Sequence, residues 1–300
     1  MLSRSLAASA TPPLEDRPMR RHHVAVVTRS VTGVVGLVLA TSCLLILRAP
    51  CAHAAGLNLR WDHCYGDAGV ANKAFACDVN TGVERLVMSF ELDAPVSDVA
   101  GVEFRVVRVS ASPAMPPWWQ FRNSGSCRLS AEALVTSVPS GTVNCVDWGG
   151  GFEVSGIGND TLSTFLPNQA AMNGVAAVPG TSLASLSAGT EYFVGTVQIN
   201  HAKTIGAGSC PGCDVPVCLV LASLNVVTTA NGNNVWLTQG AHTAASQIAT
   251  WQGGQVRNLE NICVPPGTPE RVCYTQLDCL ASQPVNLRTS TWGQVKSLYR

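Results

Sequence analysis

Apolar and polar residues alternate along several short segments of the chain, which is the pattern of half-buried β-strands. The alternation covers most of residues 86–92 and the first half of residues 102–109, and residues 192–199 are rich in β-branched and aromatic side chains. Residues 215–227 are more continuously apolar, which predicts a strand that is buried on both faces or bends between sheets. Shorter strands are expected at residues 57–61, 142–148, 152–155 and 235–238.

Glycine- and asparagine-containing turns separate these segments, for example at residues 67–69, 80–82, 159–160 and 231–232. Many short strands joined by such turns predict an all-β fold, an antiparallel β-sandwich. Residues 162–175 and 242–248 are expected to hold at most a helical turn or two. We therefore assign residues 56–255 to one β-sandwich domain.

Residues 256–300 have a different pattern and are predicted to form a disulfide-tethered tail. Residues 264–270 (Val-Pro-Pro-Gly-Thr-Pro-Glu) are typical of a linker. Four apolar residues then recur at helical spacing, which predicts a short C-terminal helix beginning near Thr291; they are Trp292, Val295, Leu298 and Tyr299. Three roles stay open for this helix: docking on its own domain, acting as a partner or sorting tag, or fraying.

The first 55 residues have the pattern of a secretory signal peptide. A basic run at residues 20–29 precedes an apolar stretch at residues 31–47, and Ala52-His53-Ala54 has the small-x-small form that signal peptidase recognises. Cleavage is expected after residue 54 or 55, and Met19 is an alternative start. An uncleaved anchor is the competing interpretation, because the apolar run lies at the lower edge of spanning length.

Composition and charge narrow the class of protein. Hydrophobic residues make up 46% of the 300 residues and charged residues 13%, so intrinsic disorder is excluded. The net charge of zero is the sum of +4 in residues 1–55 and −4 in residues 56–300. The exported part is therefore mildly acidic, so we expect no nucleic-acid partner and, after removal of the signal, no membrane span.

The cysteines agree with export to the periplasm, the cell surface or the medium, because disulfides persist in oxidising compartments. Ten cysteines follow the predicted signal peptide, an even number. They are Cys64, Cys77, Cys127, Cys145, Cys210, Cys213, Cys218, Cys263, Cys273 and Cys279.

Spacing along the chain predicts which of these cysteines pair. Three local bonds are expected, Cys64–Cys77, Cys127–Cys145 and Cys273–Cys279. Cys263 is then expected to bind one member of the cluster formed by Cys210, Cys213 and Cys218. The Cys210-Pro-Gly-Cys213 motif, with Cys218 and His201 nearby, leaves a zinc site or a redox-active pair as alternatives, although a second Cys-x-x-Cys is missing.

Trp118 and Trp119 are the candidate ligand-binding residues. Adjacent residues on a strand point to opposite faces, so both indoles cannot enter one core from a regular strand. One is expected to be exposed, where it would serve as a stacking platform for a sugar. The alternative is that both pack, one of them under the loop closed by a Cys127–Cys145 bond.

Other candidate chemistry is sparse, and no catalytic motif is present. Asp147 and Glu153 lie close in sequence and are a candidate glycosidase pair, against the simpler interpretation as ordinary surface residues. No cofactor or metal is expected, apart from a structural calcium for which Asp62 with Asp67, or Asn159 with Asp160, are candidates.

Two segments, residues 86–106 and 187–199, resemble strands of cohesin and carbohydrate-binding-module sandwiches. The resemblance implies a cohesin- or jelly-roll-like sandwich with a protein or glycan partner, but cohesins generally lack the cysteines found here. The chain also resembles a set of uncharacterised secreted proteins of environmental bacteria. Shared segments include Trp118-Trp119-Gln120-Phe121 and Cys145-Val146-Asp147-Trp148; this resemblance implies export and brings no activity.

Three functions follow from these observations. The first is an exported non-enzymatic β-sandwich that binds a glycan, a surface polymer or a protein partner. The second is a secreted polysaccharide hydrolase, which would need a cleft with converging carboxylates. The third is a structural or cell-surface protein whose C-terminal helix acts in docking or sorting. The weak candidates for catalysis favour the first.

Overall fold

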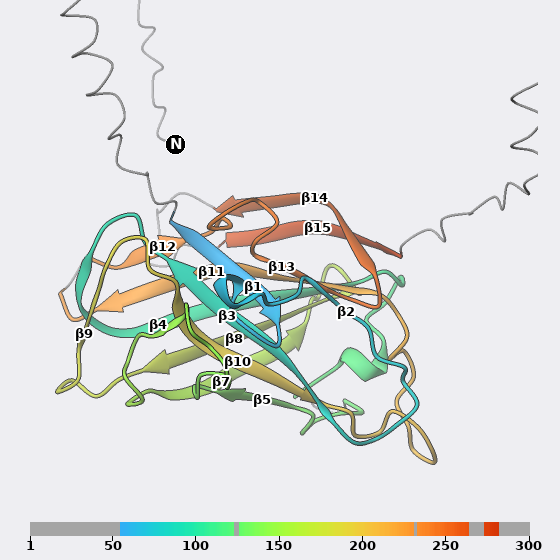
Figure 1. Ribbon diagram of the computed structural model, residues 1–300. Coiled ribbons are helices and arrows are strands. Elements are labelled where there is room, and N and C mark those ends of the chain that lie inside the picture. Colours follow the sequence, from blue (N-terminus) through green and yellow to red (C-terminus); the bar gives the residue numbers. More distant parts are fainter. Residues whose placement is uncertain (1–54, 123–125, 231–232, 264–272, 282–300) are drawn as a thin grey trace, which may run out of the picture. The chain divides into compact units, whose positions relative to one another are not determined.

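The computed structural model describes residues 55–122, 126–230, 233–263 and 273–281. The predicted signal peptide, linker and C-terminal helix lie outside these residues. Strands account for nearly all of the regular structure (Figure 1). The strands are β1 (Gly56–Trp61), β2 (Asn72–Lys73), β3 (Val83–Glu91), β4 (Val96–Ser110), β5 (Glu132–Val135), β6 (Val146–Asp147), β7 (Val154–Leu162), β8 (Gln169–Ala177), β9 (Ala184–Leu186), β10 (Tyr192–Asn200), β11 (Val217–Thr228), β12 (Val235–Leu237), β13 (Ile248–Trp251), β14 (Gly254–Cys263) and β15 (Cys273–Ala281); two 3₁₀ turns are η2 (Tyr65–Asp67) and η3 (Pro117–Trp119).

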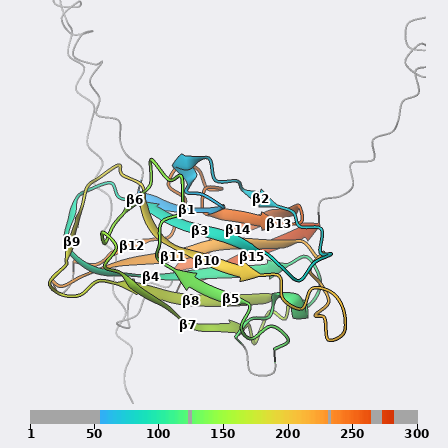
Figure 2. The same cartoon turned by 60° about the horizontal axis from the view of Figure 1, so that its bottom comes forward.

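Two antiparallel sheets form the body of the domain, which confirms the predicted β-sandwich (Figures 1 and 2). The five-stranded sheet has the order β1-β3-β10-β5, with β6 added beside β10. The eight-stranded sheet has the order β2-β13-β11-β4-β8-β7, with β12 added beside β11 and β9 beside β4. Among the strands of the described residues, only the short β6 and β2 pair in parallel with their neighbours.

Alternating side chains of both sheets fill the core between them. Strand β3 contributes Leu86, Met88 and Phe90, and β11 contributes Leu219 and Leu221, all at most 1% exposed. The residues between those of β3 point to the opposite face of the five-stranded sheet. That outer face carries the polar side chains considered below.

Strand β11 is buried on both faces, as its continuous apolar sequence predicts. Its outward residues Cys218, Val220 and Ala222 are covered by Leu277 and Cys279 of β15, in a second apolar cluster. The β14–β15 hairpin supplies this cover, and the Cys218–Cys279 disulfide fixes it to the sheet. One strand therefore faces the core on one side and the hairpin on the other.

The predicted disulfide pairing is wrong. Eight cysteines of the described residues form four bonds, none of which was predicted. The bonds are Cys64–Cys145, Cys77–Cys213, Cys127–Cys210 and Cys218–Cys279. Each joins segments at least 61 residues apart, because neighbouring strands of a sandwich come from distant parts of the chain. Cys273 and Cys279 lie six positions apart on one strand, about 20 Å at 3.3 Å per residue, which no disulfide spans. The cysteines of the 210–218 cluster are all bonded elsewhere, so neither a zinc site nor a redox pair forms among them.

The strand prediction failed most clearly over residues 162–175, where a helical turn or two was expected. The structure places β7 and β8 there, paired antiparallel from Val154 to Ala177. Strand β8 reads Gln-Ala-Ala-Met-Asn-Gly-Val-Ala-Ala, which contains few β-branched residues. It is a strand because β4 and β7 hydrogen-bond to it on its two sides, so tertiary pairing overrides its weak local preference.

A charged cluster lies between the sheets. Arg108 of β4 is 2% exposed and donates hydrogen bonds to Glu132 of β5 and to both carboxylate oxygens of Asp160 of β7. Its guanidinium also lies 4.8 Å from the centre of the Phe121 ring. The cluster joins the two sheets through side chains.

Candidate functional site

Trp118 and Trp119 are both fully buried, which corrects the expectation that one of them is exposed. They lie in the 3₁₀ turn η3 and not in a strand, so adjacent side chains need not point to opposite faces. The rings pack on each other and on Trp251, with centroids 5.2–5.6 Å apart. The alternative that both indoles pack is confirmed, although the Cys127–Cys145 bond expected to accompany it is absent.

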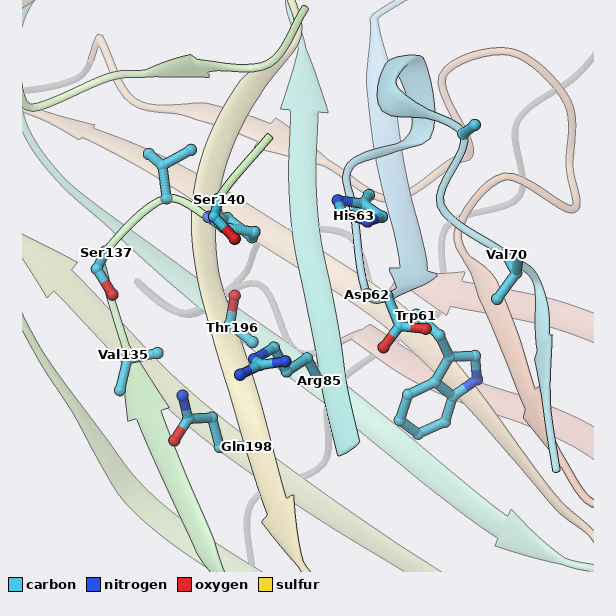
Figure 3. Close-up of a pocket in the computed structure, with 13 residues that line it drawn as sticks. Trp61, Asp62, His63, Val70, Arg85, Val135, Ser137, Ser140, Thr196 and Gln198 are labelled. Carbon is cyan, nitrogen blue, oxygen red and sulfur yellow. The ribbon is translucent and has the colours of Figure 1, made fainter. Parts of the chain in front are cut away.

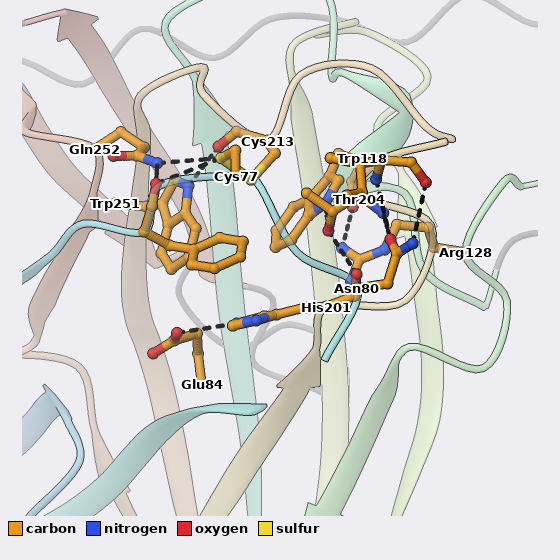
Figure 4. The surroundings of a disulfide bond; sticks show 12 residues. Cys77, Asn80, Glu84, Trp118, Arg128, His201, Thr204, Cys213, Trp251 and Gln252 are labelled. Atoms are coloured by element: carbon orange, nitrogen blue, oxygen red, sulfur yellow. Dashed lines mark hydrogen bonds and ion pairs between the residues drawn. A yellow bond between two sulfur atoms is a disulfide. The ribbon is translucent and has the colours of Figure 1, made fainter. Parts of the chain in front are cut away.

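Arg128 completes this aromatic cluster, as Figure 4 shows beside the Cys77–Cys213 disulfide. Its guanidinium lies 3.7 Å from the centre of the Trp118 ring and donates to the backbone carbonyls of Trp118, Asn200 and Ala202. Burial lowers the pKa of Arg128 to about 9. Trp118 also donates from Nε1 to the Thr204 hydroxyl. Protein groups therefore occupy both its N–H and a face of its ring.

Asp147 and Glu153 come together in the structure, but not at the spacing that glycoside hydrolysis requires. Their carboxyl groups are hydrogen-bonded to each other; burial and this bond raise the pKa of Glu153 to about 7. Glycosidases keep their two carboxyl groups about 5–5.5 Å or about 6.5–9.5 Å apart, to leave room for the sugar or for water. The Gly149 amide donates to Glu153 at 2.6 Å, so the pair holds a glycine-rich turn.

The calcium candidates are engaged by groups of the protein. Asp62 forms an ion pair with Lys73 at 2.6 Å, and Asp160 binds Arg108. Asp67 accepts three backbone N–H bonds, which outweigh the effect of burial and lower the pKa of its carboxyl group. Among the described residues, the one group with metal-ligand spacing contains the bonded sulfurs of Cys64 and Cys145.

A polar groove of about 580 Å³ lies on the outer face of the five-stranded sheet (Figure 3). Its floor is made by outward side chains of the paired strands β3 and β10, namely Arg85, Thr196 and Gln198. One wall is the segment that follows β1, residues 61–70, and the other is the segment from the end of β5, residues 135–140. Four segments distant in sequence therefore build one site.

The first wall is fixed to residues 143–145, which follow the second wall along the chain. Cys64, which follows β1, is bonded to Cys145, which precedes β6. The Asp67 carboxylate of the first wall accepts hydrogen bonds from the amides of Val143, Asn144 and Cys145, at 2.9–3.2 Å. A groove held by a covalent bond and by hydrogen bonds changes little on binding, which lowers the entropy cost of taking a ligand.

Several polar groups of the groove have no protein partner. Thr196 is 1% exposed, yet its hydroxyl makes no hydrogen bond, and the same holds for Nδ1 of His63. The side chains of Arg85, Ser137, Ser140 and Gln198 likewise make no hydrogen bond or ion pair within the described part of the chain. Buried polar atoms without partners are costly and rare in proteins, and two of these groups, the Thr196 hydroxyl and Nδ1 of His63, are buried. Arg85, Ser137 and Ser140 are exposed and Gln198 is half-buried, so these side chains can reach a ligand in the groove.

The groove was not predicted from the sequence, although a weak signal for part of it was present. Arg85 and Gln198 occupy polar positions that alternate with core residues of β3 and β10. Alternation places such residues on the outer face but does not say which of them meet. The groove depends on the β3–β10 register and on the Cys64–Cys145 bond, and the sequence reasoning predicted neither.

Comparison with known proteins adds little to this geometry. No protein-family model and no curated protein matches the chain. Among solved structures, the chain is similar to a cohesin module from a family 33 glycoside hydrolase of Clostridium perfringens, with 9% identity and a TM-score of 0.28, over 66% of this chain and 93% of that one. At that score the fold assignment rests on the strand topology described above.

The four disulfides are of the kind found in extracytoplasmic proteins, as they form and persist in oxidising compartments. In the part of the chain that the structure describes, no helix is long and apolar enough to cross a bilayer.

Proposed function

We propose that the protein is an exported, non-enzymatic binding module that takes a glycan in the groove between β3, β10 and the two wall segments. The observation that carries the proposal is the set of unpartnered hydroxyl, amide, imidazole and guanidinium groups that line one pre-formed groove. A saccharide presents donors and acceptors in equal measure, which is what such a set can satisfy. The volume of about 580 Å³ falls within the usual range for small-ligand sites.

The groove supports hydrogen bonding more than ring stacking. Trp61 contributes to the lining, but its side chain is fully buried and its Nε1 donates to the carbonyl of Thr250. The apolar part of the lining comes from small aliphatic residues, such as Val70 and Val135. Affinity would therefore come from hydroxyl recognition by Thr196, Ser137 and Gln198.

The hydrolase alternative is disfavoured by the carboxylates of the groove. Hydrolysis of a glycosidic bond uses two carboxyl groups on opposite sides of the bond. The lining contains one carboxylate, Asp62, and Lys73 binds both of its oxygens at 2.6 and 2.8 Å. Asp147 and Glu153 do not line the groove.

Thr196→Val is expected to weaken glycan binding by about three- to tenfold, the range for losing one hydrogen bond. Valine has nearly the same shape, and the Thr196 hydroxyl has no protein partner, so the variant should keep wild-type stability. The measurement is a glycan-array screen of the purified protein, followed by titration calorimetry with the best ligand.

The control is Thr161→Val, on an exposed position of β7 outside the groove, which should bind as wild type does. Equal binding by Thr196→Val and wild type would show that the groove is not the site. A protein that binds none of the glycans, but captures a cell-surface protein through the groove, would replace the glycan with a protein partner.

A further inference from the structure

The groove has an unpaired positive charge at its centre, and this charge defines the class of ligand more narrowly. We infer, on the basis of the proposed function, that the groove takes an acidic glycan and that Arg85 binds its anionic group. Carboxylates and sulfate esters share the chemistry that a guanidinium recognises, since each is an anion that presents two oxygen atoms to its fork.

Arg85 is placed for this role by β3. Its neighbours on the strand, Glu84 and Leu86, are buried on the other side, so Arg85 projects from the outer face. Figure 3 shows its guanidinium over β10, directed toward Thr196 and Gln198 and away from the His63 side of the groove. The charge therefore sits on the floor, beside the hydroxyl that has no partner.

The absence of a partner distinguishes the exposed Arg85 from the buried arginines of the domain. Arg108 binds Glu132 and Asp160, Arg128 binds three backbone carbonyls, and Arg60 binds the carbonyls of residues 59, 246 and 248. Within the described residues, Arg85 has neither a carboxylate nor a carbonyl at its guanidinium.

The one carboxylate of the groove does not neutralise Arg85. The backbone amide of Asp62 donates to the carbonyl of Arg85 at 2.8 Å, but the Asp62 side chain turns to Lys73. Lys73 also forms an ion pair with Glu84, at 3.0 Å. Because Asp62 is already paired, the charge of Arg85 is left for a ligand, and an anion in the groove meets no free carboxylate to repel it.

The neighbouring groups fit the remainder of an acidic sugar unit. Thr196 and Gln198 lie next to Arg85 along β10 and offer a hydroxyl and an amide. Ser137 and Ser140 face them from the opposite wall. A uronic acid or a sulfated sugar would place its anionic group on Arg85 and its hydroxyls on these four side chains.

The test compares matched acidic and neutral oligosaccharides by titration calorimetry with the purified protein. One arm uses oligogalacturonates against their methyl esters, and the other uses dextran sulfate oligosaccharides against unmodified dextran oligosaccharides. Binding to the acidic member of at least one pair should be about 10- to 100-fold tighter, the range for hydrogen bonds to a charged group. The arms distinguish a carboxylate from a sulfate ligand.

Arg85→Gln should remove this preference, and Arg85→Lys should restore part of it with steeper dependence on salt. Arg257→Gln is the matched control, because Arg257 is also an exposed arginine but lies on β14, outside the groove. The exposed position of Arg85 should leave the melting temperature of Arg85→Gln unchanged.

Two outcomes would overturn the inference while leaving the proposed function in place. In the first, neutral and acidic glycans bind equally, with binding still weakened by Thr196→Val. In the second, Arg85→Gln weakens both members of a pair to the same extent, which would make Arg85 a donor to neutral hydroxyls. Glycan binding that is unchanged in Thr196→Val would overturn the proposed function itself.

Discussion

Replacing Cys77 and Cys213 together by alanine is expected to lower the free energy of unfolding by about 4 kcal/mol. The bond joins residues 136 positions apart, but the retained Cys64–Cys145 and Cys127–Cys210 bonds shorten the loop that it closes to about 35 residues. In the chain-entropy model a cross-link stabilises the fold by restricting the unfolded chain, and the effect grows with the logarithm of the loop length. The bond also lies beside the aromatic cluster, where Trp251 donates from Nε1 to the carbonyl of Cys213 at 2.7 Å.

Guanidinium chloride unfolding under oxidising conditions measures this loss. The matched comparison is Cys218→Ala with Cys279→Ala, which opens a bond of separation 61. The other described bonds do not shorten that loop, so the same model predicts a loss of similar size, about 4 kcal/mol, for that pair. A Cys77/Cys213 variant that unfolds at the wild-type midpoint would contradict the prediction and would place the stability of the domain in its packing alone.

The fold was predictable from sequence where local pattern and tertiary environment agree. The β3 and β10 segments alternate because one face meets the core, and β11 is uniformly apolar because the hairpin covers its outer face. Strand β8 lacks such agreement: its alanines carry little β preference, and its neighbours β4 and β7 decide its conformation.

The cysteine pairing could not be predicted from spacing along the chain. An even count of cysteines indicates disulfides, but proximity in sequence says little about proximity in a sandwich. Cys64 and Cys145 are brought together because β1 and β6 flank the same sheet, through pairing with β3 and β10 respectively. The groove depends on the same long-range pairing, so its residues could be placed on a face of the sheet but not assembled into a site.

The predicted exposure of Trp118 or Trp119 was wrong for a different reason. The argument that adjacent side chains point to opposite faces holds for a strand, but the Pro116-Pro117 sequence starts a 3₁₀ turn there. Pro117 occupies the first turn, where proline is tolerated because its missing N–H is not needed. The two adjacent tryptophans make residues 116–121 unusual in the sequence. Both rings face inward because the backbone forms a 3₁₀ turn there and not a strand.

Arg108→Met is expected to lower the free energy of unfolding by about 3–5 kcal/mol near pH 8, the cost of breaking a buried charge cluster by removing one partner. Methionine replaces most of the apolar stem, so the loss would come mainly from the charge. Glu132 and Asp160 have side chains that are fully buried, and without Arg108 they would have no buried cation beside them.

The pH dependence distinguishes this effect from a packing defect. In the wild-type protein, burial outweighs the attraction of Arg108 and, with the nearby Asp160 carboxylate, raises the pKa of Glu132 to about 8 from its ordinary 4.5. A carboxyl group with a raised pKa stabilises the fold fully below pH 4.5, and that contribution is lost as the pH rises through 8. Removing Arg108 removes an attraction that lowers the pKa of Glu132, so that pKa rises further, and the loss caused by Arg108→Met should be smaller at pH 5 than at pH 8.

Glu132→Gln is the matched control, because glutamine has the shape of the protonated acid and does not titrate. It should be close to wild type in stability at pH 5 and should show a flatter profile between pH 5 and pH 8. Urea unfolding of the three proteins at both pH values gives the comparison. An equal loss for Arg108→Met at pH 5 and pH 8 would mean that the cluster acts through packing. A wild-type slope in Glu132→Gln would show that Glu132 is ionised throughout, so that Arg108 pairs with two charges and not one.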